Sequence, residues 1–189
     1  SNNLTKLYKT NEASLQLEFE SILLPKLTSF LHGMHHQYAS FGPTVAIAKR
    51  WLYSQLIDSF LWPDECTELI IAEMFLRNFP MEPSASPQIG FFRFLNYLAQ
   101  MAPEEDMLVV NFNDELNAEQ ISELEAQFRK NRKNFPPLFI VTSIDLEHPH
   151  QHGIWSSRAP SINILQRVQL LAECSIKLLA QDYTRMSSA

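Results

Sequence analysis

The sequence is poor in glycine. Its 189 residues include only four, at positions 33, 42, 90 and 153, and the nearest pair is nine positions apart. Phosphate-binding loops of the G-x-G-x-x-G and G-x-x-x-x-G-K-[ST] types need two or three glycines within about six residues. The G-x-S-x-G nucleophile elbow of many hydrolases also needs two close glycines. The chain therefore contains none of these loops.

Cysteine is also scarce, and long apolar runs are absent. Cys66 and Cys174 form no C-x-x-C pair and cannot supply a four-thiolate zinc site. Nothing indicates a secreted disulfide scaffold, so we expect a reducing compartment. No run of 18 apolar residues occurs, so the sequence predicts no membrane span. The chain begins Ser1-Asn2-Asn3 without an initiator Met, and we expect a segment of a longer protein.

Charged residues make up 19% of the chain, below the roughly 25% that is usual for soluble domains. The hydrophobic share of 46% is typical of a folded, core-rich chain, and the low charge suggests surface that is covered in the intact protein. The formal net charge is −6. The chain as a whole therefore lacks the basic balance of an electrostatic nucleic-acid binder.

Apolar periodicity predicts a helical first half. Helices are expected over residues 12–37, with a kink or a break at Pro25, and over 43–60, 64–77 and 88–101. A proline-rich connector precedes the last of these. The helix over 64–77 is apolar on nearly all sides, so it should lie at the centre of the module. The predicted buried stripe of the 43–60 helix consists of Val45, Ala48, Leu52, Leu56 and Phe60.

The pattern changes after Pro103. Short buried strands are predicted over 107–112 and 138–144, with helices over 117–133 and 161–182. Asn117 and Gln120 have the spacing of a capping box. Two parallel strands joined by a right-handed crossover follow from this order. The predicted fold is α+β and mostly helical, with a helical module over 1–103 and a small β-α-β-α domain over 104–189.

Metal and catalytic sites have weak signals. The six histidines fall in two clusters: His32, His35 and His36 in the first helix, and His148, His150 and His152 in a polar loop. A metalloprotease helix needs Glu where this chain has Gly33, and surface histidines are more often solvated than ligating. Asp145 and Glu147 could hold Mg²⁺, but no third carboxylate or glycine turn accompanies them. We expect no catalytic residue, metal or cofactor.

Two charged residues lie on predicted buried helix faces. Lys49 falls within the apolar stripe of its helix, and Glu73 lies between Leu69 and Ile70 on the central helix. Their charged ends could reach water past apolar stems. Alternatively, they pair with each other, or each meets a partner across a covered face.

A basic cluster ends the helix predicted over 117–133. It consists of Arg129, Lys130, Arg132 and Lys133, and the first half of the helix is acidic. This arrangement complements the helix dipole. Contact with RNA phosphates is the alternative interpretation.

Several stretches resemble the nucleolar protein 6 family, also called Nrap. They are Phe41–Trp51, Glu68–Leu76, Ser86–Leu95 and Leu108–Asn113, and the similarity extends over residues 27–175. The stretch Ser-Pro-Gln-Ile-Gly-Phe-Phe-Arg-Phe-Leu at 86–95 is the most specific of them.

The resemblance implies a poly(A) polymerase/oligoadenylate synthetase-like helical module followed by an α/β domain, without catalytic activity. It implies a scaffold of the small-subunit processome that acts in pre-ribosomal RNA processing in the nucleolus of the nucleus. The implied partners are ribosome-assembly proteins, the remaining domains of the same chain and pre-ribosomal RNA. The substrate-binding half of an active nucleotidyltransferase is the alternative. The residues expected to contact RNA or a partner are Lys49, Arg50, Arg93, Arg129, Lys130, Arg132 and Lys133.

Overall fold

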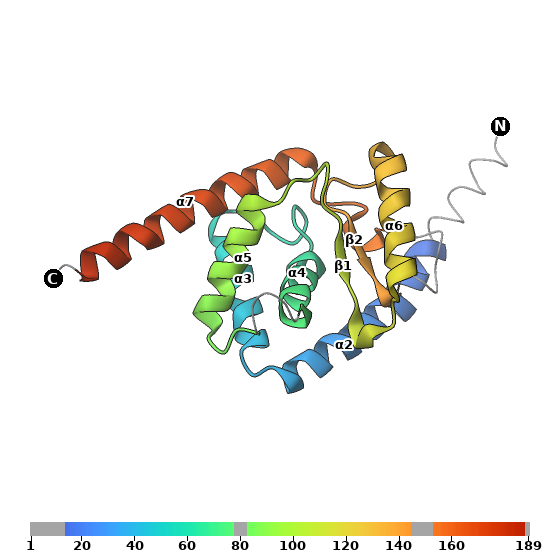
Figure 1. Ribbon diagram of the computed structural model, residues 1–189, viewed down its shortest axis with the longest axis horizontal. Coiled ribbons are helices and arrows are strands. Elements are labelled where there is room, and N and C mark those ends of the chain that lie inside the picture. Colours follow the sequence, from blue (N-terminus) through green and yellow to red (C-terminus); the bar gives the residue numbers. More distant parts are fainter. Residues whose placement is uncertain (1–13, 78–82, 145–152, 188–189) are drawn as a thin grey trace.

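Helix α4 (Asp64–Leu76) lies at the centre of the computed structural model, which describes residues 14–77, 83–144 and 153–187 (Figure 1). Consecutive side chains of α4, among them Ile70, Ile71 and Ala72, are fully buried. A helix that is buried on successive positions must be covered on every side. The prediction of a central helix is therefore confirmed.

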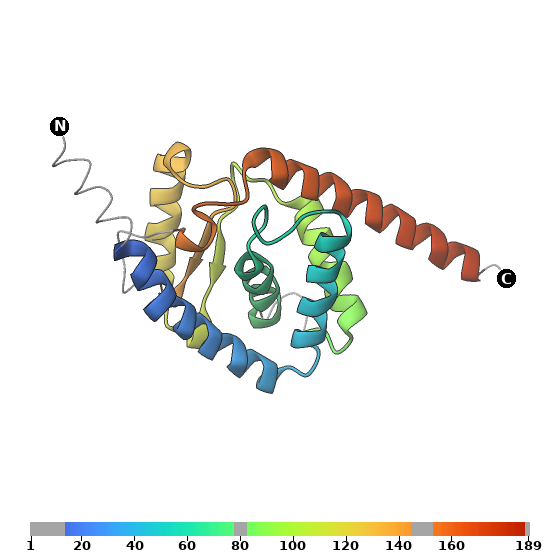
Figure 2. The ribbon, with the colours of Figure 1, turned by 180° about the vertical axis from the view of Figure 1, so that it is seen from behind.

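Three helices surround α4. They are α2 (Leu24–Gln37), α3 (Phe41–Ser54) and α5 (Pro87–Gln100), and both views place α4 between them (Figures 1 and 2). A π-helical turn (Phe19–Leu23) precedes α2. The helix continues through Pro25 by way of this turn, in which the Leu24 N–H donates to the Phe19 carbonyl.

Helices α3 and α5 approach closely at Gly90. A Cβ atom at this position would lie 2.6 Å from Thr44 Oγ1 and 2.9 Å from Thr44 Cγ2. The Thr44 side chain is fully buried and donates a 2.7 Å hydrogen bond to the Ser40 carbonyl. Only glycine fits this crossing without displacing Thr44.

The described residues contain two strands, β1 (Leu108–Val110) and β2 (Ile140–Thr142), which pair in parallel with Leu108 opposite Ile140. Helix α6 (Ala118–Asn131) connects them. Its N-terminus has the predicted capping box, with the Gln120 N–H donating to Asn117 Oδ1 at 2.9 Å. The predicted parallel pairing is confirmed.

The sheet separates two hydrophobic clusters. Leu108 and Ile140 belong to the large cluster that contains α4, whereas Phe139 and Val141 pack with Phe128 of α6. Alternate residues of a strand point to opposite faces, so β2 serves both clusters. The result is a layer of helices, the short sheet, and α6 on the outer side (Figures 1 and 2).

Short 3₁₀ turns and a long final helix complete the described chain. The turns are Phe112–Asp114, Arg132–Asn134 and Ile154–Ser156, and the final helix is α7 (Ile162–Ser187). The first half of α7 packs along α5, and its second half projects beyond the body of the molecule (Figure 1). The Trp51 indole N–H donates to Ser175 Oγ at 3.1 Å and fixes α7 to α3. In the described residues, no helix combines the length and apolarity that crossing a membrane requires.

The helix predicted over 43–60 is wrong at its C-terminal end. Helix α3 stops at Ser54, and Leu56 adopts a left-handed conformation with φ of 59°. The Leu56 N–H donates to the Tyr53 carbonyl and the Ile57 N–H to the Leu52 carbonyl, as in a Schellman motif. Leu56 is consequently 81% exposed and Phe60 86% exposed, while Ile57 occupies the core.

That the segments before and after residue 103 form two separate domains stays a prediction. In the structure, one hydrophobic cluster contains side chains from both sides of it, including Leu69, Phe94, Leu108 and Leu165. The two sequence segments therefore share a continuous core.

Candidate functional site

Lys49 forms an ion-pair cluster between α3 and α4. Its Nζ lies 2.7 Å from Glu68 Oε1 and 3.2 Å from Asp64 Oδ2. The lysine and Glu68 side chains are each less than a quarter exposed. The alternative in which Lys49 pairs with Glu73 is wrong, and the alternative of a partner across a covered face is confirmed for Lys49. Lys49 therefore holds two helices together, and acidic side chains already neutralise its charge.

The cluster contains more acid than base. Burial lowers the pKa of Lys49, but the hydrogen bond and charge of Glu68, together with Asp64, outweigh it and raise the pKa above its usual value. Burial raises the pKa of Glu68, and the charges of Glu65 and Asp64 add to the increase against the opposing effect of Lys49. The Lys49 ammonium group thus pairs with two carboxylates, and its raised pKa keeps it protonated.

Glu73 has its own partner on α4. Its Oε1 accepts from Arg77 Nε at 2.5 Å, one helical turn away. Burial raises the pKa of Glu73, although the Arg77 charge and hydrogen bond act in the opposite direction. Burial and the nearby Glu73 charge also raise the pKa of Tyr97. This pair is local to α4 and brings no charge to the surface beyond Arg77 itself.

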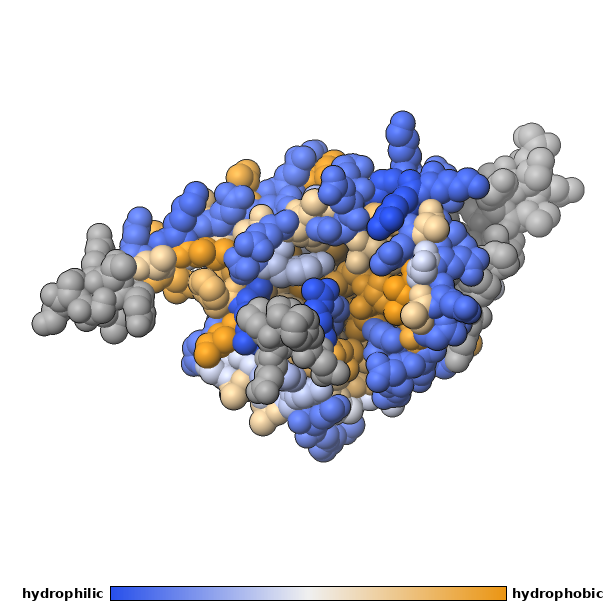
Figure 3. Space-filling model, viewed as in Figure 1, coloured by the Kyte–Doolittle hydropathy of each residue, from blue (hydrophilic) through white to orange (hydrophobic). Residues whose placement is uncertain are grey.

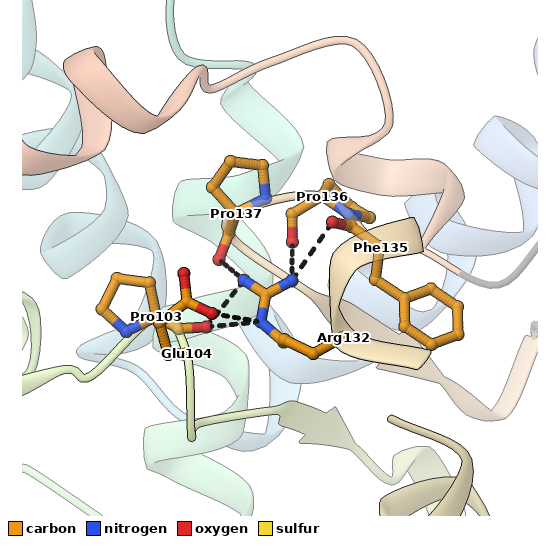
Figure 4. A network of polar contacts seen from close by, with 6 residues as sticks. All are labelled: Pro103, Glu104, Arg132, Phe135, Pro136 and Pro137. Atoms are coloured by element: carbon orange, nitrogen blue, oxygen red, sulfur yellow. Dashed lines mark hydrogen bonds and ion pairs between the residues drawn. The ribbon is translucent and has the colours of Figure 1, made fainter. Parts of the chain in front are cut away.

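Arg132 is an internal connector, not an exposed contact residue (Figure 4). Its guanidinium donates to the carbonyls of Pro103, Phe135, Pro136 and Pro137 at 2.7–3.1 Å. The side chain is 13% exposed, and its Cζ lies 5.1 Å from the centre of the Phe128 ring. Arg132 therefore joins the segment after α5 to the segment before β2.

The other predicted contact residues lie on three helices. Arg129 and Lys130 are exposed in the last turn of α6, with Lys133 just beyond it. Arg129 is 3.8 Å from Glu125, one turn earlier. Arg50 is exposed on α3 and Arg93 is half-buried on α5. The exposed basic set that the structure brings together is thus the end of α6, without Arg132.

A shallow, open groove of about 490 Å³ lies between side chains on one face of α7. Its lining consists of Asn163, Gln166, Arg167, Leu170, Leu171 and Cys174. Leu170 is 62% exposed, and Leu178, two turns further along the same face, is 63% exposed. Apolar side chains are visible along the projecting half of α7 in Figure 3.

The groove begins beside the turn that follows α3. Arg167 Nη2 donates to the Gln55 carbonyl at 3.1 Å, which places exposed Leu56 next to this end of α7. This surface is not among those expected from the sequence. The signal was present in the spacing of Leu170, Cys174 and Leu178, which form a second apolar stripe on one helix.

The histidines of the first cluster lie on and after the middle of α2. His32 and His36 are exposed and face each other, while His35 packs edge-on against Phe41. In the described residues, no group of three or more His, Cys, Asp or Glu side chains is arranged to hold a metal. The second histidine cluster at 148, 150 and 152, together with Asp145 and Glu147, lies outside the described residues.

Comparison with known proteins identifies the family. Residues 38–188 match the family described as "Nrap protein PAP/OAS1-like domain 5". The chain belongs to the Nrap family. This Nrap domain is 42% identical over 176 residues to "Nucleolar protein 6" of Xenopus tropicalis, which covers 93% of the chain and 15% of that relative. It is 39% identical over 173 residues to "Nucleolar protein 6" of Drosophila yakuba, covering 91% of the chain and 14% of that relative.

The Nrap domain thus spans about one-seventh of the length of these curated relatives. Its α+β, mostly helical architecture agrees with the PAP/OAS1-like description and with the fold class predicted from the sequence.

Proposed function

We propose that this Nrap domain is a non-catalytic docking module of a nucleolar protein. Its named relatives support a nucleolar role. In the proposal the domain acts within the small-subunit processome, in pre-ribosomal RNA processing in the nucleus. It holds ribosome-assembly proteins and the remaining domains of the same chain.

The observation that carries this proposal is the stripe of exposed leucines on α7. Leu170 and Leu178 expose more than half of their surface on a helix that projects from the body (Figure 1). Exposed apolar side chains that gather on one face are typical of protein contacts. Of the residues expected to bind RNA, Lys49 and Arg132 are instead engaged inside the domain. Protein docking is therefore favoured over binding of pre-ribosomal RNA.

The test uses the full-length protein purified in its native particle. Lys177 is exposed on α7, next to Leu178, so its amine can report neighbours by chemical crosslinking. We expect Lys177 to crosslink to another protein or another domain, and Leu170→Asp with Leu178→Asp to remove that crosslink. Leu17→Asp places the same change at a leucine that is 66% exposed and lies far from α7 in the sequence, so it should leave the crosslink unchanged.

RNA binding is tested in the same particle. Lys130→Ala with Lys133→Ala removes two exposed cations beyond the ion pair of Arg129. Each lost phosphate contact on single-stranded RNA would reduce the salt dependence of binding by about 0.7 in logarithmic slope. If these variants release the protein from the particle and the leucine variants do not, the docking proposal is wrong.

The alternative function is the substrate-binding half of an active nucleotidyltransferase, which the PAP/OAS1-like description favours. Such an enzyme needs three carboxylates and a Gly-Ser turn in a catalytic domain. Nucleotide incorporation by the full-length protein, abolished by substitution of those carboxylates, would establish the alternative and overturn the non-catalytic proposal.

A further inference from the structure

His32 and His36 form a convergent pair on the exposed side of α2. They lie four residues apart, so one helical turn brings their side chains onto the same face. Their Nε2 atoms are 3.0 Å apart. The ring centres are 4.5 Å apart and the ring planes are nearly perpendicular, at 87°. In the structure the two rings thus share a hydrogen bond, in which one Nε2 donates and the other accepts, and both residues are exposed.

The separation of the two nitrogens suits a shared metal ion. Zinc binds imidazole nitrogen at about 2.0–2.1 Å. Two such bonds place the nitrogens about 2.9 Å apart at a right angle and about 3.4 Å apart at a tetrahedral angle. The observed 3.0 Å lies within this range. A bound metal ion would replace this hydrogen bond, with both neutral rings carrying their proton on Nδ1 so that each Nε2 offers a lone pair.

We propose that His32 and His36 chelate one divalent transition-metal ion through their Nε2 atoms. Neutral imidazole is a preferred ligand of Zn²⁺, Cu²⁺ and Ni²⁺, whereas Mg²⁺ and Ca²⁺ select oxygen. Water fills the remaining coordination positions, since the described residues contain no group of three ligands. The proposal revises the expectation of no metal site. That expectation came from the sequence, which does not show how the histidine rings are oriented.

His35 provides a matched control on the same helix. Its ring packs edge-on against Phe41, with centres 5.1 Å apart, and fills the space beside Gly42. It therefore differs from its two neighbours in orientation and not in chemistry. A metal that bound any surface histidine would not distinguish His35 from His36.

Calorimetric titration of the full 189-residue chain with Zn²⁺ tests the proposal. The histidines at 148, 150 and 152 are replaced by alanine in every sample, so that zinc bound elsewhere does not enter the comparison. We expect one Zn²⁺ per chain and an affinity that falls by at least about tenfold in His32→Ala and in His36→Ala, because each removes one of two ligands. The His35→Ala variant should bind as the parent does.

Histidine NMR signals identify the ligands in the same titration. Zinc should shift the ring signals of His32 and His36 together and leave those of His35 in place. Circular dichroism of each variant checks that α2 remains folded, which its exposed positions lead us to expect. The proposal is overturned if the parent chain binds no zinc, or if His35→Ala weakens binding as much as His36→Ala does.

Discussion

Replacing Arg132 by alanine should destabilise the domain by about 3 kcal/mol. The guanidinium makes five contacts with four carbonyl oxygens, and Pro103 O accepts two of them. A hydrogen bond from a charged donor contributes about 1.5–3 kcal/mol net. If water reaches two of the four carbonyls after truncation, two remain unpaired, which gives a loss of about 3 kcal/mol. Loss of the contact with the Phe128 ring adds to this.

Arg132→Lys should restore only part of the lost stability. Lysine carries all its donors on one nitrogen, so it cannot reach the carbonyls that the planar arginine guanidinium contacts on both of its sides. The expected order of unfolding free energy is wild type, then Arg132→Lys, then Arg132→Ala. Urea unfolding followed by circular dichroism measures these differences. The neighbouring Lys133→Ala removes an exposed cation and should change stability by less than about 0.5 kcal/mol.

The opposite pattern would refute this reasoning. If Arg132→Ala loses less than about 1 kcal/mol, the four carbonyls do not depend on the guanidinium. If the variant instead lowers affinity for RNA without loss of stability, Arg132 acts as a surface contact, as the sequence first suggested.

Four further substitutions test other parts of the structure by unfolding experiments. Gly90→Ala should destabilise the domain by about 1–2 kcal/mol because its Cβ would overlap Thr44. Gly33→Ala should stabilise it by up to about 1 kcal/mol, because nothing lies within 4 Å of the added Cβ. Equal effects of the two substitutions would contradict the close approach of α3 and α5 at Gly90. Leu56→Gly should stabilise by about 0.5 kcal/mol because glycine adopts the left-handed region without strain, and a loss of stability would show that the leucine side chain contributes. Burial raises the pKa of Glu73, so above pH 4.5 the folded state binds more protons than the unfolded state, and stability falls as the pH rises through the folded pKa. Glu73→Gln should remove this decrease in stability. An unchanged dependence of stability on pH would refute the assignment to Glu73.

The elements that depend on local sequence could be predicted. The apolar run of α4, the Asn117–Gln120 capping box and the two short strands each carry their signal within a few residues. The end of α3 could not be predicted, because helical periodicity continues through Leu56 although that residue is left-handed. No glycine marks the stop, and a leucine at this position is unusual.

The partners of the charged residues were harder to predict. Lys49 was recognised as unusual, but choosing Glu68 and Asp64 over Glu73 requires knowing how α3 faces α4. The acceptors of Arg132 are backbone carbonyls, one of them 29 positions away, and every residue carries a carbonyl, so the sequence does not show which of them Arg132 contacts. The α7 groove was predictable in part, since its leucines follow a helical stripe.

Arg132 supplies hydrogen-bond donors to two segments of the chain that are poor in backbone N–H groups. Three of its four acceptors belong to prolines, at positions 103, 136 and 137, and a proline residue offers a carbonyl but no N–H. Segments of this kind have more acceptors than donors and cannot satisfy each other through a backbone ladder. Arginine is a donor without acceptor capacity, so one side chain balances the surplus on both segments. Glutamine or neutral histidine at this position would add a further acceptor to a site where acceptors already outnumber donors.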